Sequence, residues 1–423
     1  MYSIAILVGG RGERVKRITN GSSKSEIYLS KNKKIVDFQL EKLLKIKKKI
    51  YFISNIEFDQ LKKYVLTKYK NNRIKFLEEK KRYGTGGSLN LLKKFNEDHY
   101  ILIFGDLLFN LNFKNLMKFH ISKKSDCTIV VHPNSHPYDS DCVKLDEFQR
   151  LMKFYKKPHK KEINNLCLAG IILINKNILK LIKNNKFQDF SKNIIPKILK
   201  KKMKIFGYNS REYIKDVGTS KRIVEAKKDL NSIKYLNGII DKKIPAIFLD
   251  RDGVINYDQD DGKYQDPTKI IPGAQNAIKN INSNGYLCVL VTNQPAVAKG
   301  FIKISKLKND FDFLQNKLGK NGAYIDRIYF CPHHPKKGFR GEIKSLKFNC
   351  NCRKPKNGMF IKAIKELNID HRKSYMIGDK YSDYLAAKKS KIKFIYIGKE
   401  KNNLLNKKNL HSAVNYIFKT KPS

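Results

Sequence analysis

The sequence is poor in several residue types and patterns, and each shortage narrows the class of protein. Its 423 residues include no tryptophan, and 38 Asp and Glu stand against 88 Lys and Arg, for a formal net charge of +50. No apolar run approaches the roughly 20 residues of a membrane-spanning helix, so we expect no membrane insertion. The first residues, MYSIAILVGG, lack a preceding basic region and a small-residue cleavage site, which predicts a buried strand and no signal peptide.

Cysteine is also scarce and irregularly placed. The seven cysteines are an odd number, and four of them lack the paired spacing of a disulfide framework: Cys127, Cys142, Cys167 and Cys288. This pattern predicts a reduced, cytoplasmic protein.

Basic residues are the type in clear excess, and a charge of this sign is typical of nucleic-acid-binding proteins. The basic segments are scattered, however, over residues 42–50, 194–205 and 401–410, and no recognised nucleic-acid motif accompanies them. Compositional drift together with anionic substrates therefore explains the charge better than nucleic acid as the main partner, which stays the minor alternative. Such a field would speed the capture of small phosphorylated ligands. The sequence does not indicate an oligomeric state.

Short apolar runs alternate with longer amphipathic stretches along the chain. Each run ends in Gly, Asp, Asn or Ser, as strands do at one edge of a parallel sheet; the runs include residues 3–9, 49–54, 99–106, 246–253, 286–293 and 374–379. The alternation predicts an α/β protein with two doubly wound domains. A Lys-rich polar segment before Pro245 separates the two series. The predicted parts are a domain over 1–235, a linker over 236–245, a second domain over 246–400 and a tail with a terminal helix over 401–423.

The sharper chemical pattern lies in the second predicted domain. Asp250 and Asp252 end the strand in IFLDRDGVIN, and Thr292 and Asn293 end the next strand. Ligands bind at the carboxyl ends of strands in open α/β sheets. Of two carboxylates that flank one residue, one can attack a phosphorus atom while the other gives or takes a proton. The hydroxyl and the amide can hold phosphate oxygens.

Two later segments add cations and a metal ligand. Arg353 and Lys354 can offset the charge of a phosphoryl group in transfer. Asp379 follows another strand, where a carboxylate can complete a Mg²⁺ site built from oxygen atoms.

A separate metal-binding pattern lies between these segments. CPHHP and CNCRKP each supply two ligands, and two such pairs can fold around one tetrahedral zinc ion: Cys331, His333, Cys350 and Cys352. We choose His333 over His334 because one residue then separates the ligands, as in the second pair. Four protein ligands close the coordination shell, so this zinc would be structural and would clip a polar loop.

The ordered set DxDG, TN, Lys and GDxxxD resembles the haloacid dehalogenase-type phosphatases. The resemblance implies that Asp250 is the nucleophile that accepts the phosphoryl group and that Asp252 is the acid and base. It also implies Mg²⁺ held by Asp250, the Asp252 carbonyl group and Asp379, with Lys354 as the charge stabiliser.

With the zinc loop included, residues 246–398 resemble the D-glycero-D-manno-heptose 1,7-bisphosphate phosphatases. The shared motifs are FLDRDGVIN, the loop DQDDGKY, VTNQ, CPHH, CNCRKP and IGDK. The resemblance implies these substrate-binding residues: Asp258, Thr292, Asn293, Gln294, Arg353 and Lys380. Pro295 and Ala296 stand where the family commonly has Ser-Gly, which leaves the substrate open. The histidinol-phosphate phosphatases share the scaffold and the zinc loop and remain an alternative.

A glycine-rich turn follows the first strand of the chain. In ILVGGRGERV, the glycines Gly9, Gly10 and Gly12 let backbone N–H groups approach a triphosphate, and Arg14 adds a fork of donors. Lys24 lies downstream as a second cation.

Further elements of the first domain follow in order. A second glycine turn opens a helix with Gly84, Thr85, Gly86 and Gly87. Asp106 and Asp216 end distant strands, and two such carboxylates can hold Mg²⁺ from both sides while pyrophosphate leaves.

Residues 1–230 resemble the sugar-1-phosphate nucleotidyltransferases, with a Rossmann-like fold of the GT-A type. The resemblance implies that a sugar 1-phosphate attacks the α-phosphorus of a nucleoside triphosphate. Arg14 and Lys24 would neutralise phosphates, Asp106 and Asp216 would bind Mg²⁺, and the turn at Gly84–Gly87 would face the base or sugar. Four positions depart from the family: Ser23 and Ser25 replace the prolines beside the lysine, Asn110 replaces an acidic residue, and Lys156 replaces the Glu of Glu-Lys-Pro.

The two resemblances together indicate more than either alone. A heptose bisphosphate phosphatase yields heptose 1-phosphate, which a sugar-1-phosphate nucleotidyltransferase consumes. The first half is most similar to the heptose 1-phosphate guanylyltransferases, so GTP is the expected donor; the paired-histidine motif of the adenylyl branch is not found. We therefore expect a bifunctional enzyme that makes nucleotide-activated heptose for lipopolysaccharide or capsule. The alternatives are a phosphatase with a non-catalytic first domain, a histidinol-phosphate-type phosphatase joined to another sugar nucleotidyltransferase, and, more remotely, a nucleic-acid-associated protein.

Overall fold

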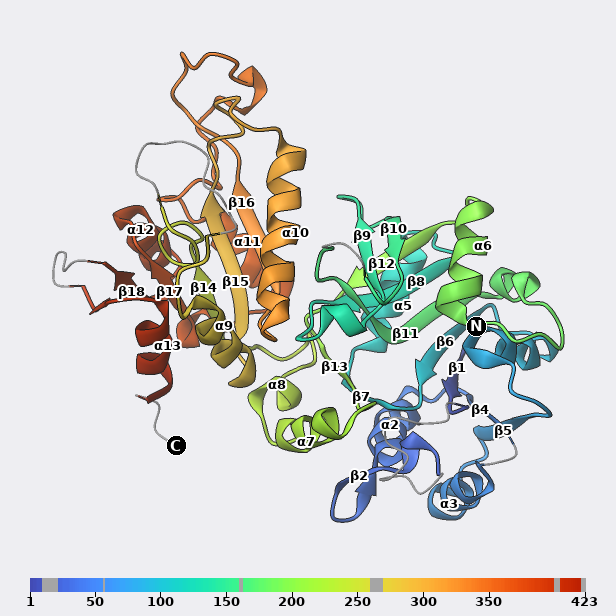
Figure 1. The fold of residues 1–423 in the computed structure, drawn as a ribbon. Helices are drawn as coiled ribbons and strands as arrows, with labels where there is room; N and C mark the ends of the chain where they lie inside the picture. The colour runs from blue at the N-terminus through green and yellow to red at the C-terminus, as the bar shows by residue number, and fades with distance from the viewer. Residues whose placement is uncertain (10–21, 56–57, 160–162, 259–268, 399–403, 420–423) are drawn as a thin grey trace. The chain divides into compact units, whose positions relative to one another are not determined.

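A computed structural model describes residues 1–9, 22–55, 58–159, 163–258, 269–398 and 404–419 (Figure 1). These residues form two compact units. The first unit comprises Met1–His132, Val143–Lys156 and Cys167–Ile239. The second comprises Pro133–Cys142, Lys157–Leu166 and Ile240–Ser423, so two short segments from the first half of the sequence belong to it.

The first unit is built on a mixed sheet. Its parallel part has the order β6-β1-β4-β5, with β1 at Tyr2–Leu7, β4 at Ile50–Asn55, β5 at Ile74–Glu79 and β6 at His99–Phe104. Strand β11 (Cys167–Asn175) runs antiparallel to β6. It extends the sheet to β8 (Cys127–His132), β12 (Ile205–Asn209), β9 (Cys142–Leu145) and β10 (Leu151–Tyr155). Buried β-branched and aromatic side chains favour this arrangement, because both faces of the central strands are covered.

Helices and a small ribbon complete the first unit. The helices α2, α3 and α5 contribute apolar side chains to one core with β1, β4 and β6; they span Ile35–Leu43, Asp59–Tyr69 and Phe113–Ser122. The other described helices are α4 (Gly84–Gly87), α6 (Ile195–Lys200), α7 (Ser220–Asp229) and α8 (Ile233–Leu236). Strand β7 (Leu107–Asn110) pairs antiparallel with β13 (Tyr213–Asp216), and β2 (Tyr28–Ser30) pairs with β3 (Lys33–Lys34). The pairing of β7 with β13 brings the residues that precede β7 beside the end of β13.

The second unit contains a wholly parallel sheet of order β16-β15-β14-β17-β18-β19. Its strands are β14 (Ala246–Leu249), β15 (Leu287–Asn293), β16 (Arg327–Cys331), β17 (Tyr375–Gly378), β18 (Lys393–Ile397) and β19 (Asn406–Lys407). If the six strands are numbered 1 to 6 along the sequence, starting with β14, their order in the sheet is 3-2-1-4-5-6. The chain therefore reverses direction across the sheet between β14 and β17, and the carboxyl ends of these two strands form the expected ligand crevice.

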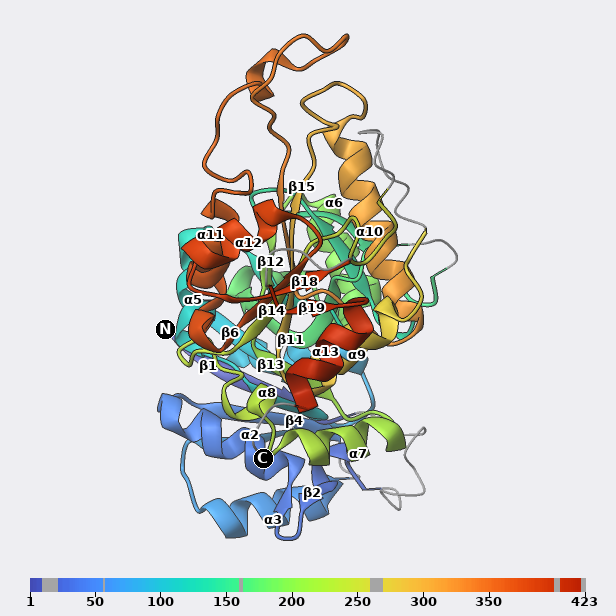
Figure 2. The same ribbon diagram turned by 90° about the vertical axis from the view of Figure 1, so that its left-hand side faces the viewer.

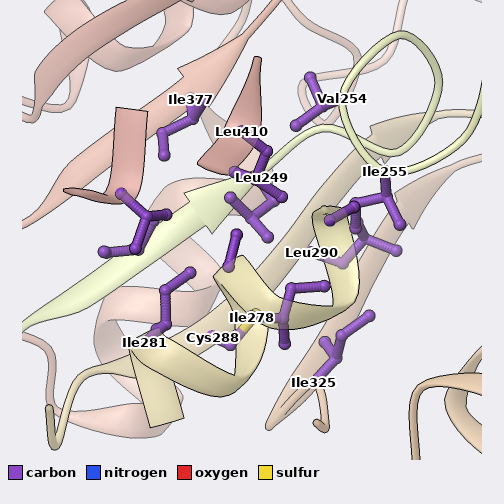
Figure 3. Packing of buried hydrophobic residues seen from close by; sticks show 14 of the residues in the cluster. Leu249, Val254, Ile255, Ile278, Ile281, Cys288, Leu290, Ile325, Ile377 and Leu410 are labelled. Carbon is purple, nitrogen blue, oxygen red and sulfur yellow. The ribbon is translucent and has the colours of Figure 1, made fainter. Parts of the chain in front are cut away.

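Helices cover both faces of this sheet (Figure 2). Helices α9, α10 and α13 pack on one face; they span Ala274–Ser283, Ile304–Lys320 and Leu410–Lys419. Helices α11 (Gly358–Leu367) and α12 (Tyr381–Lys389) pack on the other face. Figure 3 shows the first of these cores, where Ile278 and Ile281 of α9 meet Leu249 and Leu290 of the sheet. The predicted α/β class and the doubly wound second domain are confirmed.

The segment predicted as a tail carries the last helix of the core. Leu410, Ala413, Val414 and Ile417 of α13 are buried at helical spacing against the sheet and α9. Among the described helices, none is long and apolar enough to cross a lipid bilayer.

Candidate active sites and metal centre

Asp250 lies at the switch point of the second sheet, directly after β14. Its backbone N–H donates to the carbonyl group of Ile377 in the neighbouring strand at 3.1 Å. The Nζ atom of Lys354 lies 3.0 Å from Asp250 Oδ2 and 2.6 Å from Asp383 Oδ1, and it donates to the Val291 carbonyl group at 2.9 Å. Burial opposes the charge of Lys354, but the carboxylates of Asp250 and Asp383 outweigh it and raise the pKa of Lys354. A fixed ammonium ion thus faces the predicted nucleophile.

Three carboxylates meet beside this lysine. One oxygen from each of Asp250, Asp379 and Asp383 lies within 4.8 Å of the others. Burial and the two neighbouring acids raise the pKa of Asp379 to about 8. Its Oδ1 atom is buried and has no hydrogen-bond partner among the described residues. A hard divalent cation would satisfy this oxygen and relieve the repulsion, so these donors fit Mg²⁺.

Gly253 lies directly against Asp379 of this cluster. Its φ is +80°, and an added Cβ atom would lie 2.1 Å from Asp379 Oδ2. Glycine is therefore required here for both backbone conformation and space.

Asn293 and Thr292 stand at the end of β15. The Asn293 amide clamps the backbone of Lys354: its Oδ1 accepts from the Lys354 N–H at 3.0 Å, and its Nδ2 donates to the Lys354 carbonyl group at 3.1 Å. The Thr292 side chain accepts a hydrogen bond from Gln294 at 3.0 Å. The two Asn293 contacts link β15 to the loop that carries Lys354.

The remaining predicted residues of this site pair with neighbouring groups. Lys380 Nζ pairs with Asp258 Oδ2 at 2.7 Å, and Arg353 Nη1 donates to the His333 carbonyl group at 3.4 Å. The carboxylate of Asp252 pairs with Arg251, and burial raises the pKa of Asp252 against the lowering effect of that guanidinium.

The four predicted zinc ligands converge at one point. Cys352 Sγ lies 3.2 Å from Cys331 Sγ and 3.3 Å from Cys350 Sγ, and His333 Nδ1 lies 3.2 Å from Cys352 Sγ. Burial lowers the pKa of His333, which favours the neutral imidazole that a metal binds. His334 Nδ1 instead lies 3.2 Å from the Lys336 carbonyl group. Three thiols and one imidazole this close fit a single tetrahedral metal ion.

In the first unit, Lys24, Asp106 and Asp216 gather around Gly218. A Cβ atom on Gly218 would lie 3.2 Å from Asp216 Oδ1, 3.7 Å from Lys24 Nζ and 3.9 Å from Asp106 Oδ2. Lys24 Nζ pairs with Asp106 Oδ2 at 2.9 Å, and Arg222 Nη1 pairs with Asp216 Oδ1 at 2.5 Å. Both carboxylates thus lie near Gly218, and each is paired with a cationic side chain.

Both serines beside Lys24 have structural roles. Ser23 caps the short helical turn Lys24–Glu26 by accepting from the Ser25 N–H, and Ser25 Oγ donates to the Gly105 carbonyl group at 2.8 Å. Asn110 accepts from Lys42 Nζ at 2.9 Å and donates to the Tyr235 carbonyl group at 2.8 Å. These departures from the family pattern are therefore integrated into the fold.

The turn at Gly84–Gly87 is held by a neighbouring segment. The N–H groups of Gly86 and Gly87 donate to the Gln188 carbonyl group at 2.7 and 2.9 Å, and Thr85 Oγ1 accepts from the Phe190 N–H at 2.9 Å. These groups therefore shape the turn. Gly9 is described, whereas Gly10, Gly12 and Arg14 lie outside the described residues.

Four polar residues near the two sites were not singled out from the sequence: Glu79, Arg222, Arg251 and Asp383. Asp383 carried a signal, since it is the second acid of the motif GDxxxD. Glu79 ends a strand, and its Oε2 atom would lie 3.4 Å from a Cβ atom on Gly9. Burial raises the pKa of Glu79 to about 7.

Comparison with known proteins identifies two families. The nucleotidyl transferase family model matches residues 4–233, and the haloacid dehalogenase-like hydrolase model matches residues 190–391. The chain is 42% identical over 149 residues to the D-glycero-β-D-manno-heptose-1,7-bisphosphate 7-phosphatase of Haemophilus ducreyi, which covers 35% of this chain and 79% of that protein. It is 43% identical over 148 residues to the enzyme of the same name from Pasteurella multocida, covering 35% and 78%.

Among solved structures, the chain is similar to HddC from Yersinia pseudotuberculosis complexed with GMP-PN. The identity is 20%, the TM-score is 0.47, and the match covers 55% of this chain and all of HddC (100%). A likeness at this level does not define a substrate. Through the family model for its first half and the relatives above 40% identity, the chain belongs to two families at once, the nucleotidyl transferases and the D-glycero-β-D-manno-heptose-1,7-bisphosphate 7-phosphatases.

Proposed function

We propose that this protein is a bifunctional enzyme of nucleotide-activated heptose synthesis. It removes the 7-phosphate of D-glycero-D-manno-heptose 1,7-bisphosphate and transfers a guanylyl group from GTP to the resulting heptose 1-phosphate. The observation that carries the proposal is the presence on one chain of both families, with Lys354 fixed against Asp250 in the second unit.

The phosphatase reaction has two steps. In the first, a carboxylate oxygen of Asp250 attacks phosphorus, the bond from phosphorus to the sugar oxygen breaks, and Asp252 gives its proton to that oxygen. In the second, Asp252 takes a proton from water, the water oxygen attacks phosphorus, and phosphate leaves with the regeneration of Asp250. Lys354 offsets the negative charge in both steps.

The nucleotidyl transfer needs no covalent intermediate on the protein. A phosphate oxygen of the heptose 1-phosphate attacks the α-phosphorus, and the bond to the β-phosphate oxygen breaks, which releases pyrophosphate. Lys24, and Arg14 by the family resemblance, would hold the phosphates. GTP as the donor rests on the sequence resemblance of the first half.

The expected metals divide by role. Mg²⁺, held by Asp250, Asp379 and the Asp252 carbonyl group and, in the first unit, by Asp106 and Asp216, would shield phosphate oxygens from one another. Zinc on Cys331, His333, Cys350 and Cys352 would order the loop that continues into Arg353 and Lys354. We further propose the cytoplasm as the location, because nucleoside triphosphates occur there and the described cysteines form no disulfide bonds.

The test is a ³¹P NMR assay of the full-length protein with heptose 1,7-bisphosphate and each nucleoside triphosphate in turn. We expect release of phosphate, then of pyrophosphate with GTP, and a GDP-sugar as product. Asp250→Asn should abolish the first release, and Asp106→Asn should abolish only the second. Phosphate release without any GDP-sugar would indicate a phosphatase with a non-catalytic first half. Preferential hydrolysis of histidinol phosphate would instead favour the alternative of a histidinol-phosphate-type phosphatase.

A further inference from the structure

Arg251, the residue between the two catalytic aspartates, contacts both of them. Its backbone N–H donates to Asp250 Oδ1 at 2.7 Å. Its guanidinium group grips both carboxylate oxygens of Asp252, with Nε 2.8 Å from Oδ1 and Nη2 3.1 Å from Oδ2. A bidentate pair of this kind fixes the orientation of a carboxylate as well as its charge.

Gln294 closes the network from the end of β15. Its Oε1 accepts from Arg251 Nη2 at 3.0 Å. Its Nε2 donates to Asp252 Oδ2 at 2.9 Å and to Thr292 Oγ1 at 3.0 Å. A side-chain amide has two N–H donors, and both are used here. Gln294 therefore has no N–H donor left for a sugar hydroxyl group.

The network is almost completely withdrawn from solvent. Arg251 is 1% exposed, Gln294 3% and Thr292 1%. The Arg251 guanidinium lies over the ring of Phe311, 5.8 Å from its centroid. The backbone around Arg251 is also held: the N–H of Ile255 donates to the Arg251 carbonyl group at 2.8 Å. Buried polar groups that hydrogen-bond to one another are held in one geometry.

We propose that Arg251 and Gln294 are positioning residues for Asp252, and that they aim its carboxyl group at the leaving oxygen of the sugar phosphate. The proposal rests on the proposed phosphatase function. In the step concerned, Asp250 forms a bond to phosphorus, the bond from phosphorus to the sugar oxygen breaks, and the Asp252 proton moves to that oxygen. An alkoxide leaves poorly without this proton, whereas a 2,4-dinitrophenolate ion leaves readily without it.

The experiment compares two substrates on the full-length protein: heptose 1,7-bisphosphate and 2,4-dinitrophenyl phosphate. General acid catalysis contributes about 10²- to 10⁴-fold, so Arg251→Met should lower kcat/KM for the sugar phosphate about 10²-fold or more. For the dinitrophenyl ester the same variant should lose less than about fivefold, since it has little need of the acid. Arg372→Met, an exposed arginine outside the site, is the matched control and should change neither value.

Two further variants separate positioning from other roles. Gln294→Met should lower kcat for the sugar phosphate with KM unchanged, because Gln294 is buried and both of its N–H donors bind protein groups. Adding Arg251→Met to Asp252→Asn should cause almost no further loss, because the two residues act as one unit.

The outcomes are distinct. An equal loss on both substrates, a raised KM with unchanged kcat in Gln294→Met, or additive losses in the double variant would overturn the proposal. If the wild-type protein hydrolyses neither ester, the phosphatase function itself is wrong. Since Arg251 is buried, bound zinc and thermal unfolding verify the fold, and Gln294→Met decides the question if Arg251→Met unfolds.

Discussion

Lys354 and Asp383 form a buried ion pair of 2.6 Å, and the same ammonium group donates to the carbonyl group of Val291 in strand β15 at 2.9 Å. The lysine therefore has partners on two elements besides Asp250, and its position does not depend on a bound phosphate.

Removing this lysine should affect both activity and stability. In Lys354→Met, Asp250 and Asp383 lose their counter-ion inside the protein, which typically costs about 3–5 kcal/mol. We expect loss of phosphate release and a lower unfolding temperature for the second unit, measured by phosphate assay and calorimetry. Lys362→Met is the control, because Lys362 is 65% exposed and should tolerate the change. A variant that retains more than half of the wild-type turnover would contradict the role of Lys354.

The glycine over the carboxylate cluster gives a second prediction. In Gly253→Ala the new methyl group must displace Asp379, so Mg²⁺ should no longer stabilise the second unit. Wild-type protein at a hundredfold excess of Mg²⁺ over its dissociation constant should gain about 2.7 kcal/mol. The measurement is the shift of the unfolding temperature with added Mg²⁺.

Gly338→Ala isolates the effect of backbone conformation. Gly338 also has a positive φ, +95°, but a Cβ atom there would meet nothing within 4 Å among the described residues. This variant should keep the full Mg²⁺ shift. The same loss of shift in both variants would mean that strain, and not the contact with Asp379, is responsible.

The metal centre predicts a contrast between adjacent histidines. His333→Gln should lower the zinc content below one ion per chain, whereas His334→Gln should leave it unchanged, because only His333 lies among the thiols. Loss of zinc should also reduce phosphate release, since Cys352 directly precedes Arg353 and Lys354. Zinc is measured by atomic emission on purified protein, and equal zinc in both variants would mean that His333 is not a ligand.

A pair of histidines in the first unit should make its stability sensitive to acid. The rings of His99 and His120 lie 5.1 Å apart, and His120 Nδ1 lies 2.8 Å from Thr128 Oγ1. Burial, with the neighbouring His99, lowers the pKa of His120 to about 4. The unfolded chain takes up a proton near pH 6.5 and the folded unit does not, so stability is complete above pH 6.5 and is lost as the pH falls towards 4.

This linkage amounts to about 2 kcal/mol between pH 7.5 and pH 5, since one pKa unit corresponds to 1.36 kcal/mol. Urea unfolding at the two pH values measures it. His120→Leu should flatten the pH dependence, and His411→Asn, on an exposed histidine, should not. An unchanged pH dependence in His120→Leu would show that other groups dominate.

Much of the second unit's fold was predictable from the sequence, because each apolar run predicts a strand and the polar residue at its end predicts a place in the site. The apolar runs that end at Asp250, Asn293 and Asp379 predicted a parallel sheet with polar residues at one edge, and the structure has that sheet. The antiparallel direction of β11 within the first sheet was not predicted, because a buried strand shows the same apolar pattern in either direction.

The sequence by itself determined which chemical groups the chain carries and in what order: two aspartates around Arg251, a lysine after the cysteine pair, and an acid after each of several strands. Only the tertiary structure decided how these groups are paired. Arg251 pairs with Asp252, and Lys354 forms ion pairs with both Asp250 and Asp383. The side-chain amide of Gln294 donates to Asp252. The physical reason is that hydrogen-bonding and ion-pairing partners in a doubly wound sheet come from strands and loops far apart in the chain, and burial allows each polar group few alternatives.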